Sequence, residues 1–367
     1  MKLFVGIKTC LTVILVVAAC GLSSYARETK ANASGIVVVA STVPANGDIN
    51  PYGIARVPLS NGALVAGNIL VSNFNSSANL QGTGTTIVQI APDGTSSLFA
   101  QIDATTLPGP CPGGIGLTTA LSVLRSGWVI VGSLPTTDGT SATAQAGCLL
   151  VLNSTGSVVE TFYGSLINGP WDMTALDGGS TASLFVTNVL NGTVAGGGSV
   201  VLGGTVTRLN LTGLNGAMPA LEAITVIGSG FAERTDPAAL VIGPTGVGLS
   251  PDGSTLYVAD ALINRVAAIS DPVTRVTSAG TGTTVTQGGS LNDPLGLTVL
   301  TSGSILTVNG NNGFLLGFSP SGVQLEQALL DSNGTPPGAG ALFGLVDVAG
   351  QGLYYVDDAT NTLNLWQ

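Results

Sequence analysis

The sequence predicts an all-β protein, a six-bladed β-propeller closed by an N-terminal strand. A pattern returns six times along the 367 residues: a Pro or apolar residue, usually a Gly, a short apolar strand, a turn, and a second strand ending in Asn or Asp. Repeats of this period are typical of propeller blades. The composition agrees, because 53 Gly and 18 Pro make a turn-rich chain and no long stretch has a helical period. The copies begin at Pro51, Pro112, Pro170, Pro244, Pro294 and Leu342.

The N-terminal residues are predicted to be an export signal, since Lys2 and Lys8 precede an apolar run too short to span a bilayer. Two processing sites remain open: Ser24-Tyr25-Ala26 has the form of an ordinary cleavage site, whereas Val17-Ala18-Ala19-Cys20 resembles a bacterial lipobox with Cys20 acylated. We expect a secreted or periplasmic protein, or one lipid-anchored to the cell envelope, without a transmembrane span in the mature chain. The predicted divisions are 1–26 as signal peptide (1–19 for a lipoprotein), 27–34 as linker and 35–367 as propeller.

The ring is predicted to close through its two ends. The last blade runs out of chain after its third strand at Trp366, while Gly35 to Ser41 is a β-branched segment without a partner. We expect this segment to be the outermost strand of the last blade, which removes an exposed edge. Second strands are predicted at 68–72, 128–132, 183–187, 255–259, 304–308 and 352–356, and third strands at 85–91, 148–152, 205–209, 265–269, 314–318 and 362–366.

The connections between second and third strands differ in length. They span 73–84, 133–147 and 188–204 in the first three blades and are much shorter in the others. Because all of them emerge on the face where the inner strands begin, we expect the long ones to form a wall over half the channel mouth. Long ordered loops are often functional, so the wall marks a candidate binding face.

Two of the four cysteines lie in the fold. Cys111 precedes the first strand of the second blade and Cys148 opens the third strand of the same blade, so a disulfide is possible. An exported protein favours that bond over two free thiols. Catalysis by cysteine is poorly supported, because the chain has no His to act as its base.

Charge excludes one class of function. From Gly35 onward there are six Arg, no Lys and nineteen Asp or Glu, a net charge of −13. This field repels polyanions, and there is no basic stripe to neutralise phosphates. Nucleic acid is therefore not a partner.

The Gly-strand-P-D-G-strand-Asp pattern resembles the NHL-repeat and gluconolactonase (senescence marker protein) group of six-bladed propellers, and secreted bacterial proteins of NHL-repeat type. The resemblance covers essentially the whole mature chain, and it implies the fold more than an activity. In the gluconolactonase family, Glu, Asn and Asp just before the first-strand Gly hold a divalent metal. The positions matching them here carry neither carboxylate nor amide, so neither metal nor other cofactor is expected. They are Tyr52, Gly113, Trp171, Thr245, Leu295 and Phe343. Related antibiotic lyases and quinone-dependent dehydrogenases rely on His, which is absent.

An aromatic set is the main candidate for ligand binding. Tyr52, Trp171 and Phe343 fall on the face where the inner strands begin, and Asp172 replaces the usual Gly beside Trp171. These residues either bind a carbohydrate or small organic ligand, or plug the axis. Asx residues that end second strands on the same face either join the site or cap their own loops. They are Asn73, Asn188, Asp260, Asn309 and Asp357.

Two classes of function remain. The first is a non-catalytic propeller that binds a small molecule, glycan or envelope protein. The second is a hydrolase or lyase with a non-standard site, for which Asp172 and Asp260 are the candidate acid–base pair. The lack of His, of a metal set and of a nucleophile motif favours the first class, so no catalytic residue is assigned.

Overall fold

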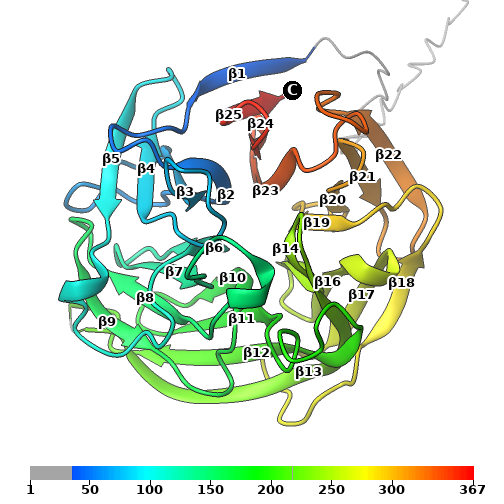
Figure 1. Cartoon of the computed structure of the whole chain (residues 1–367), viewed down its shortest axis with the longest axis horizontal. Helices are drawn as coiled ribbons and strands as arrows, with labels where there is room; N and C mark the ends of the chain where they lie inside the picture. Colours follow the sequence, from blue (N-terminus) through cyan, green and yellow to red (C-terminus); the bar gives the residue numbers. More distant parts are fainter. Residues whose placement is uncertain (1–34, 217) are drawn as a thin grey trace, which may run out of the picture. The chain divides into compact units, whose positions relative to one another are not determined.

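In a computed structural model of the chain, residues 35–216 and 218–367 are described. They form six antiparallel sheets arranged as the blades of a propeller (Figure 1). The predicted signal peptide and linker, including Cys20, lie outside the described residues. None of the helices in the described part has the length and apolar character needed to cross a membrane.

The blades follow one another in chain order. The first blade contains β2 (Ile49–Arg56), β3 (Ile69–Asn75), β4 (Thr86–Ile90) and β5 (Ser96–Gln101). The second contains β6 (Leu117–Val123), β7 (Val129–Ser133), β8 (Cys148–Leu152) and β9 (Val158–Phe162). The third contains β10 (Pro170–Asp177), β11 (Ala182–Asn188), β12 (Val201–Thr212), β13 (Ala220–Asp236) and β14 (Leu240–Ile242). The fourth blade contains β15 (Pro244–Leu249), β16 (Thr255–Asp260), β17 (Arg265–Ser270) and β18 (Thr283–Gln287). The fifth contains β19 (Pro294–Val299), β20 (Ile305–Asn309), β21 (Phe314–Phe318) and β22 (Gln324–Leu329). Short 3-10 helices are η1 (Ala104–Thr106), η2 (Ser141–Thr143) and η3 (Ala261–Ile263).

The sixth blade joins the two ends of the described chain. It contains β23 (Leu342–Val348), β24 (Gly352–Asp357), β25 (Thr362–Trp366) and, as its outermost strand, β1 (Ile36–Ser41). β1 pairs antiparallel with β25, and the N–H of Gln367 extends the ladder by donating to the carbonyl of Gly35 at 3.0 Å. Figure 1 shows the blue β1 beside the red β25. The predicted closure by an N-terminal strand is confirmed.

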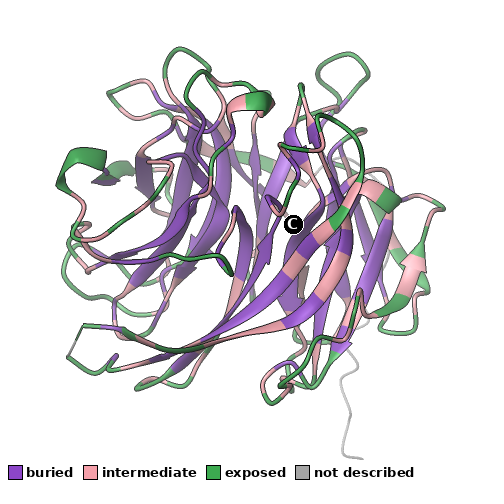
Figure 2. Ribbon diagram, turned by 60° about the horizontal axis from the view of Figure 1, so that its bottom comes forward, coloured by how far each residue is buried: buried purple, intermediate pink, exposed green. Residues whose placement is uncertain are grey.

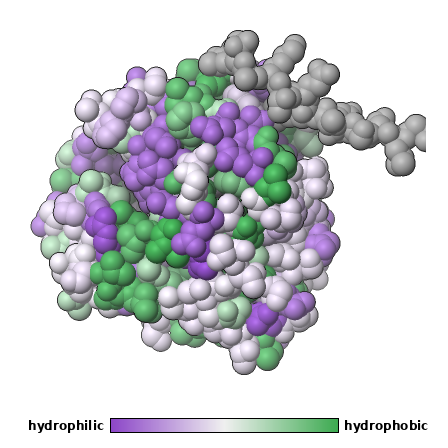
Figure 3. Space-filling model, turned by 90° about the vertical axis from the view of Figure 1, so that its right-hand side faces the viewer, coloured by the Kyte–Doolittle hydropathy of each residue, from purple (hydrophilic) through white to green (hydrophobic). Residues whose placement is uncertain are grey.

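The core lies between the blades. All seven residues of β3 are buried, whereas the outer strands β5 and β22 each expose four of their six residues. A second strand is covered by a neighbouring blade on each face, so it needs apolar residues on both sides. Figure 2 shows this as buried strands inside and exposed loops at their ends. On the side seen in Figure 3, hydrophilic and hydrophobic patches lie side by side among near-neutral residues.

The second blade begins later than expected. Its first strand starts at Leu117, because Leu117 pairs with Ser133 as Pro51 pairs with Asn73 in the first blade. The predicted start at Pro112 was wrong. The Pro-Gly-Gly segment at that position lies beside the β7–β8 loop instead, and the N–H of Gly113 donates to the carbonyl of Ala146 in that loop at 2.8 Å. Cys111 and Cys148 form a disulfide that ties this segment to β8.

Candidate functional site

The innermost strand of every blade begins at one face of the ring, which we call the start face, and ends at the opposite end face. Near the start face, aromatic side chains fill the axis. The Tyr52 ring stacks on Phe343 at 3.8 Å and on Phe74 at 4.5 Å between centroids, and Trp171 meets Tyr52 edge-on at 5.9 Å. All four side chains are buried. The predicted aromatic residues therefore meet, and they close the axis as one layer, the aromatic layer.

A pocket of about 420 Å³ lies on the start-face side of this layer, a volume within the usual range for small-molecule sites. Tyr52, Trp171 and Phe343 are part of its lining. Asn79 and Gln81, from the long loop of the first blade, line it as well. The start face thus carries a candidate site, the start-face pocket.

A hairpin absent from the sequence interpretation forms part of this pocket. β13 and β14 pair from Arg234 with Ile242 to Asp236 with Leu240, and Figure 1 shows β14 near the middle of the ring beside β19. The carbonyl of Ala238 at its tip accepts a hydrogen bond from Gln81 Nε2 at 3.2 Å. The hairpin therefore reaches from the third blade to the loop of the first.

The expected wall of three loops is only partly present. Of the three, only the first-blade loop lines the pocket. Loop residues of the second and third blades, such as Leu134 and Val189, are buried in one cluster with Trp171 and Val241. They lie beneath the hairpin because their apolar side chains pack there. Of the three long loops, the first-blade loop alone therefore borders the start-face pocket.

Two carboxyl groups face the start-face pocket from neighbouring blades. Asp293 precedes β19 and Asp358 follows β24, and both are partly buried. Burial raises the pKa of Asp293 to about 6, and the charge of Asp236 on the hairpin acts in the same direction. Burial, followed by the charge of Asp357, raises the pKa of Asp358 to about 7. Carboxyl groups with such pKa values can exchange protons with a substrate near neutral pH.

Asn50 and Tyr52 surround Asp358. The side-chain amide of Asn50 contacts the Asp358 carboxyl and lies 3.1 Å from the amide nitrogen of Asn75. The Tyr52 hydroxyl is bonded to Asn50, while burial and the charge of Asp358 raise the pKa of Tyr52 well above its ordinary value. Tyr52 is therefore a neutral phenol that can donate a hydrogen bond.

Asp172 lies on the other side of the aromatic layer. It lines a separate cavity of about 310 Å³ toward the end face, which we call the end-face channel, and does not line the start-face pocket. Trp171 and Asp172 border a common space between the two cavities, but that space has no accessible volume. The expectation of one site containing both residues was wrong.

The Asx residues that end second strands are structural. The Asn73 amide donates to the carbonyl of Thr42 at 3.1 Å, and the Asn188 amide donates to Thr207 Oγ1 at 3.2 Å. The Asp260 carboxylate forms a buried ion pair with Arg265 at 2.7 Å. None of the three lines the start-face pocket or the end-face channel. Asp172 and Asp260 are consequently not an acid–base pair.

The residues at the axis do not fit the metal expected from the family resemblance. Thr118, rather than Gly113, is the second-blade residue at the matching position, since it follows Leu117 as Tyr52 follows Pro51. Stacked aromatic rings occupy two of the positions, and the Thr245 hydroxyl donates to the carbonyl of Pro294 at 2.9 Å. Within residues 35–216 and 218–367, no group of three or more His, Cys, Asp or Glu is arranged to hold a metal ion.

The sequence did hold a signal for the missed pocket residues. The residue before Pro51, Leu117, Pro170, Pro244, Pro294 and Leu342 is Gly or Ala in four blades, but it is Asn50, within β2, in the first blade and Asp293 in the fifth. Asn50, Asp293 and Gly169 have φ values of +67°, +60° and +76°. Gly, Asn and Asp tolerate this left-handed conformation best. The left-handed backbone conformation at these positions thus favours Asn or Asp, which places polar side chains beside the axis.

Comparisons with known proteins establish the fold. No protein-family model matches the chain, and no curated protein matches its sequence. Among solved structures, a calcium-binding protein, regucalcin, from Agrobacterium tumefaciens aligns with a TM-score of 0.57 at 13% identity over 89% of this chain and 92% of its own. A gluconolactonase from Xanthomonas campestris aligns at 0.54 and 13% identity over 90% and 88%. A luciferin-regenerating enzyme aligns at 0.54 and 11% identity over 90% and 94%. The chain is therefore, in its fold, a gluconolactonase-like six-bladed β-propeller.

Proposed function

We propose that the protein is a metal-independent hydrolase of a small, neutral, sugar-like lactone or ester, bound in the start-face pocket. The observation that carries this proposal is the presence of two carboxyl groups with different raised pKa values, Asp293 and Asp358, in one pocket with an aromatic floor. This pair favours the enzymatic reading over the non-catalytic binder. The fold likeness to proteins described as gluconolactonases supports the choice of a lactone.

We assign Asp293 as the general base and Asp358 as the general acid. Between the pKa of Asp293, about 6, and that of Asp358, about 7, Asp293 is mostly ionised and Asp358 mostly protonated. Asp293 takes a proton from water as the water oxygen adds to the ester carbonyl. When the tetrahedral intermediate breaks its C–O bond, Asp358 gives its proton to the leaving oxygen. Proton exchange with solvent then restores both groups.

The remaining lining suits a neutral polar ring. Aromatic faces at Tyr52 and Trp171 bind the apolar side of a sugar-like molecule. The side-chain amides of Asn79 and Asn311 supply N–H donors for the carbonyl oxygen, whose negative charge grows in the transition state. The acidic surface disfavours anionic substrates.

A panel of aldonolactones and aryl esters, assayed with matched variants, tests the proposal. Asp293→Asn and Asp358→Asn should each lower kcat by about 100-fold with little change in KM, because general acid–base catalysis has this magnitude. Asp271→Asn is the control, since Asp271 is exposed and does not line the pocket. The acidic limb of the pH–rate profile should belong to Asp293 and the alkaline limb to Asp358. Lactone binding without turnover would overturn the hydrolase, and full activity in both variants would overturn the roles given to Asp293 and Asp358.

We also propose that the protein acts outside the cytoplasm. The Cys111–Cys148 disulfide supports this location, because such bonds persist in oxidising compartments. The intact mass of the protein recovered from the cell envelope and the medium tests it. A mass for a chain starting near Arg27, or at an acylated Cys20, is expected, and an unprocessed chain in the cytosol would contradict export.

A further inference from the structure

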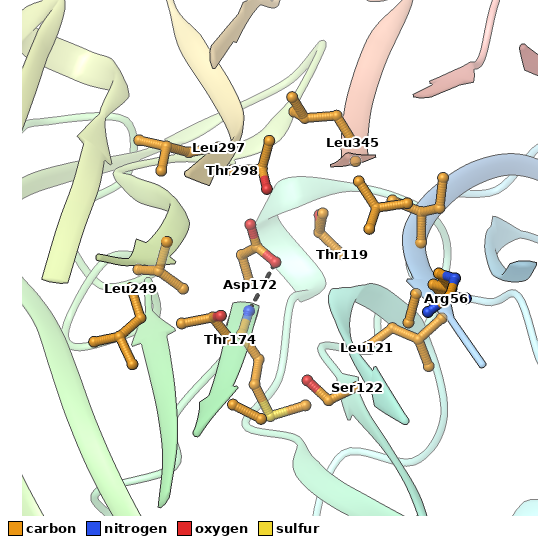
Figure 4. A pocket seen from close by; sticks show the side chains of 18 of the residues that line it. Arg56, Thr119, Leu121, Ser122, Asp172, Thr174, Leu249, Leu297, Thr298 and Leu345 are labelled. Atoms are coloured by element: carbon orange, nitrogen blue, oxygen red, sulfur yellow. Dashed lines mark hydrogen bonds between the residues drawn. The ribbon is translucent and has the colours of Figure 1, made fainter. Parts of the chain in front are cut away.

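The end-face channel is built by all six innermost strands. Its walls are mainly apolar side chains, such as Leu121, Leu249, Leu297 and Leu345, and Figure 4 shows them around a central space. The exposed Arg56, at the end of β2, lies at its mouth, so the channel opens on the end face. The aromatic layer closes its other end, where the space among Trp171, Asp172 and Phe343 has no accessible volume.

A carboxyl group stands at the closed end. The position of Asp172 in its blade is Gly in four others, Gly53, Gly246, Gly296 and Gly344, because the inner strands converge there. A Cβ at Gly246 or Gly296 would overlap a carbonyl oxygen of the next blade. Asp172 nevertheless occupies this position, and it is only 9% exposed. The second blade has Thr119 at the matching position, and both side chains line the channel.

Within the described residues, Asp172 forms no ion pair. The N–H of Met173 donates to Asp172 Oδ1 at 2.7 Å, drawn as the dashed line in Figure 4, and the backbone of Val247 donates as well. The other charged groups of the lining, Arg56 and Asp177, belong to the far ends of their strands. Burial raises the pKa of Asp172 to about 8.

An unpartnered hydroxyl lies at the same closed end. Thr119 lines both the channel and the adjoining space beside Asp172, and its buried Oγ1 has no hydrogen-bond partner. Buried polar atoms of folded proteins are nearly always bonded, so an orphaned one at the end of a cavity indicates a missing partner. Carboxylate and hydroxyl oxygens together form an acceptor pair for an N–H donor.

We propose that the end-face channel binds a primary alkylammonium ion, with its ammonium group on Asp172 and Thr119 and its alkyl chain along the leucine-rich wall. The chemistry of the channel selects this class: an uncompensated carboxyl group needs a cation, the apolar walls need a hydrocarbon, and the narrow closed end excludes bulky quaternary groups. The net negative charge of the protein attracts such a cation. This site is separated from the start-face pocket by the aromatic layer and does not depend on the proposed hydrolase.

Calorimetric titration of the protein with n-hexylamine and with 1-hexanol tests the proposal. The two probes share the alkyl chain and differ in charge, so the amine should bind at least about tenfold more tightly at about pH 9, as a charged hydrogen bond provides. At about pH 6.5, where Asp172 is protonated, amine binding should release close to one proton, measured by comparing buffers of different ionisation enthalpy.

Two variants on one strand complete the test. Asp172→Asn keeps the shape of the side chain and should reduce amine affinity to that of hexanol, with no proton release. Asp177→Asn makes the same change at the channel mouth and should alter affinity by less than about threefold, because that charge is exposed to solvent screening. Equal binding of amine and alcohol to the unaltered protein would overturn the proposal. So would the absence of proton release, or undiminished amine binding by Asp172→Asn with normal thermal unfolding.

Discussion

At the scale of single residues, the place of a residue in the repeat does not by itself tell which cavity its side chain lines. Trp171 and Asp172 are adjacent in sequence, yet one lines the start-face pocket and the other the end-face channel. These two residues lie at a bulge of β10, between Pro170 and Met173, where the regular alternation of the strand is broken. The aromatic residues could be predicted because they occupy matching positions of different blades. Asp293 and Asp358 could not, because they line one pocket only when the fifth and sixth blades close around the axis.

Asp172 should make the stability of the protein depend on pH. Its pKa rises from 3.8 to about 8 on folding, so between these pH values the folded state keeps a proton that the unfolded chain releases. The free energy of unfolding therefore falls as pH rises through this range and levels off above it. Asp172→Asn lacks this titration, while other carboxyl groups titrate equally in both proteins. We expect the Tm of the variant, minus the Tm of the unaltered protein, to increase as the pH is raised from about 5 to about 9. A constant difference in Tm would contradict the raised pKa.

At the scale of elements, strands were easier to predict than their insertions. The third strands at 148–152, 314–318 and 362–366 coincide with β8, β21 and β25, because short apolar runs between turns define them. The hairpin of β13 and β14 was missed, since its 17-residue strand and three-residue partner depart from the blade pattern. The start of the second blade was misplaced because a Pro-Gly-Gly loop imitates the motif.

The disulfide should stabilise the second blade. Cys111 and Cys148 enclose a segment with a sequence separation of 37, and joining them restricts the unfolded chain. Replacing both by Ser should lower the free energy of unfolding by about 4 kcal/mol, the contribution expected for a loop of this size. Urea denaturation measures it, and reduction of the unaltered protein should give the same loss. An unchanged midpoint with an unchanged m-value would show that the bond is dispensable.

At the scale of the whole molecule, closure makes one ring of blades that are far apart in sequence. β1 covers the edge of β25, and the N–H of Asn50 donates to Asn361 Oδ1 at 2.7 Å across the junction of the first and last blades. The repeat predicted this architecture because each blade carries the same pattern. It could not predict the pocket chemistry, which depends on residues that break the pattern.

Deleting residues 35–41 should open the ring. The edge of β25 would lose its ladder partner, and unpaired strand edges promote aggregation. We expect a broadened thermal transition and association visible by light scattering. Val38→Thr, on the exposed side of β1, is the control and should change stability by less than about 0.5 kcal/mol. A truncated protein that stays monomeric and melts as before would refute closure through β1.

The most direct test of the account is the metal dependence of lactone hydrolysis. Stacked aromatic rings occupy the axis where a metal would be held in the gluconolactonase family, so the chemistry is assigned to Asp293 and Asp358. Elemental analysis of the purified protein, combined with assays before and after EDTA treatment, measures this directly. We predict no stoichiometric divalent metal and hydrolysis unchanged by EDTA. A bound metal in equimolar amount, with activity lost on chelation and restored by adding that metal, would contradict the account.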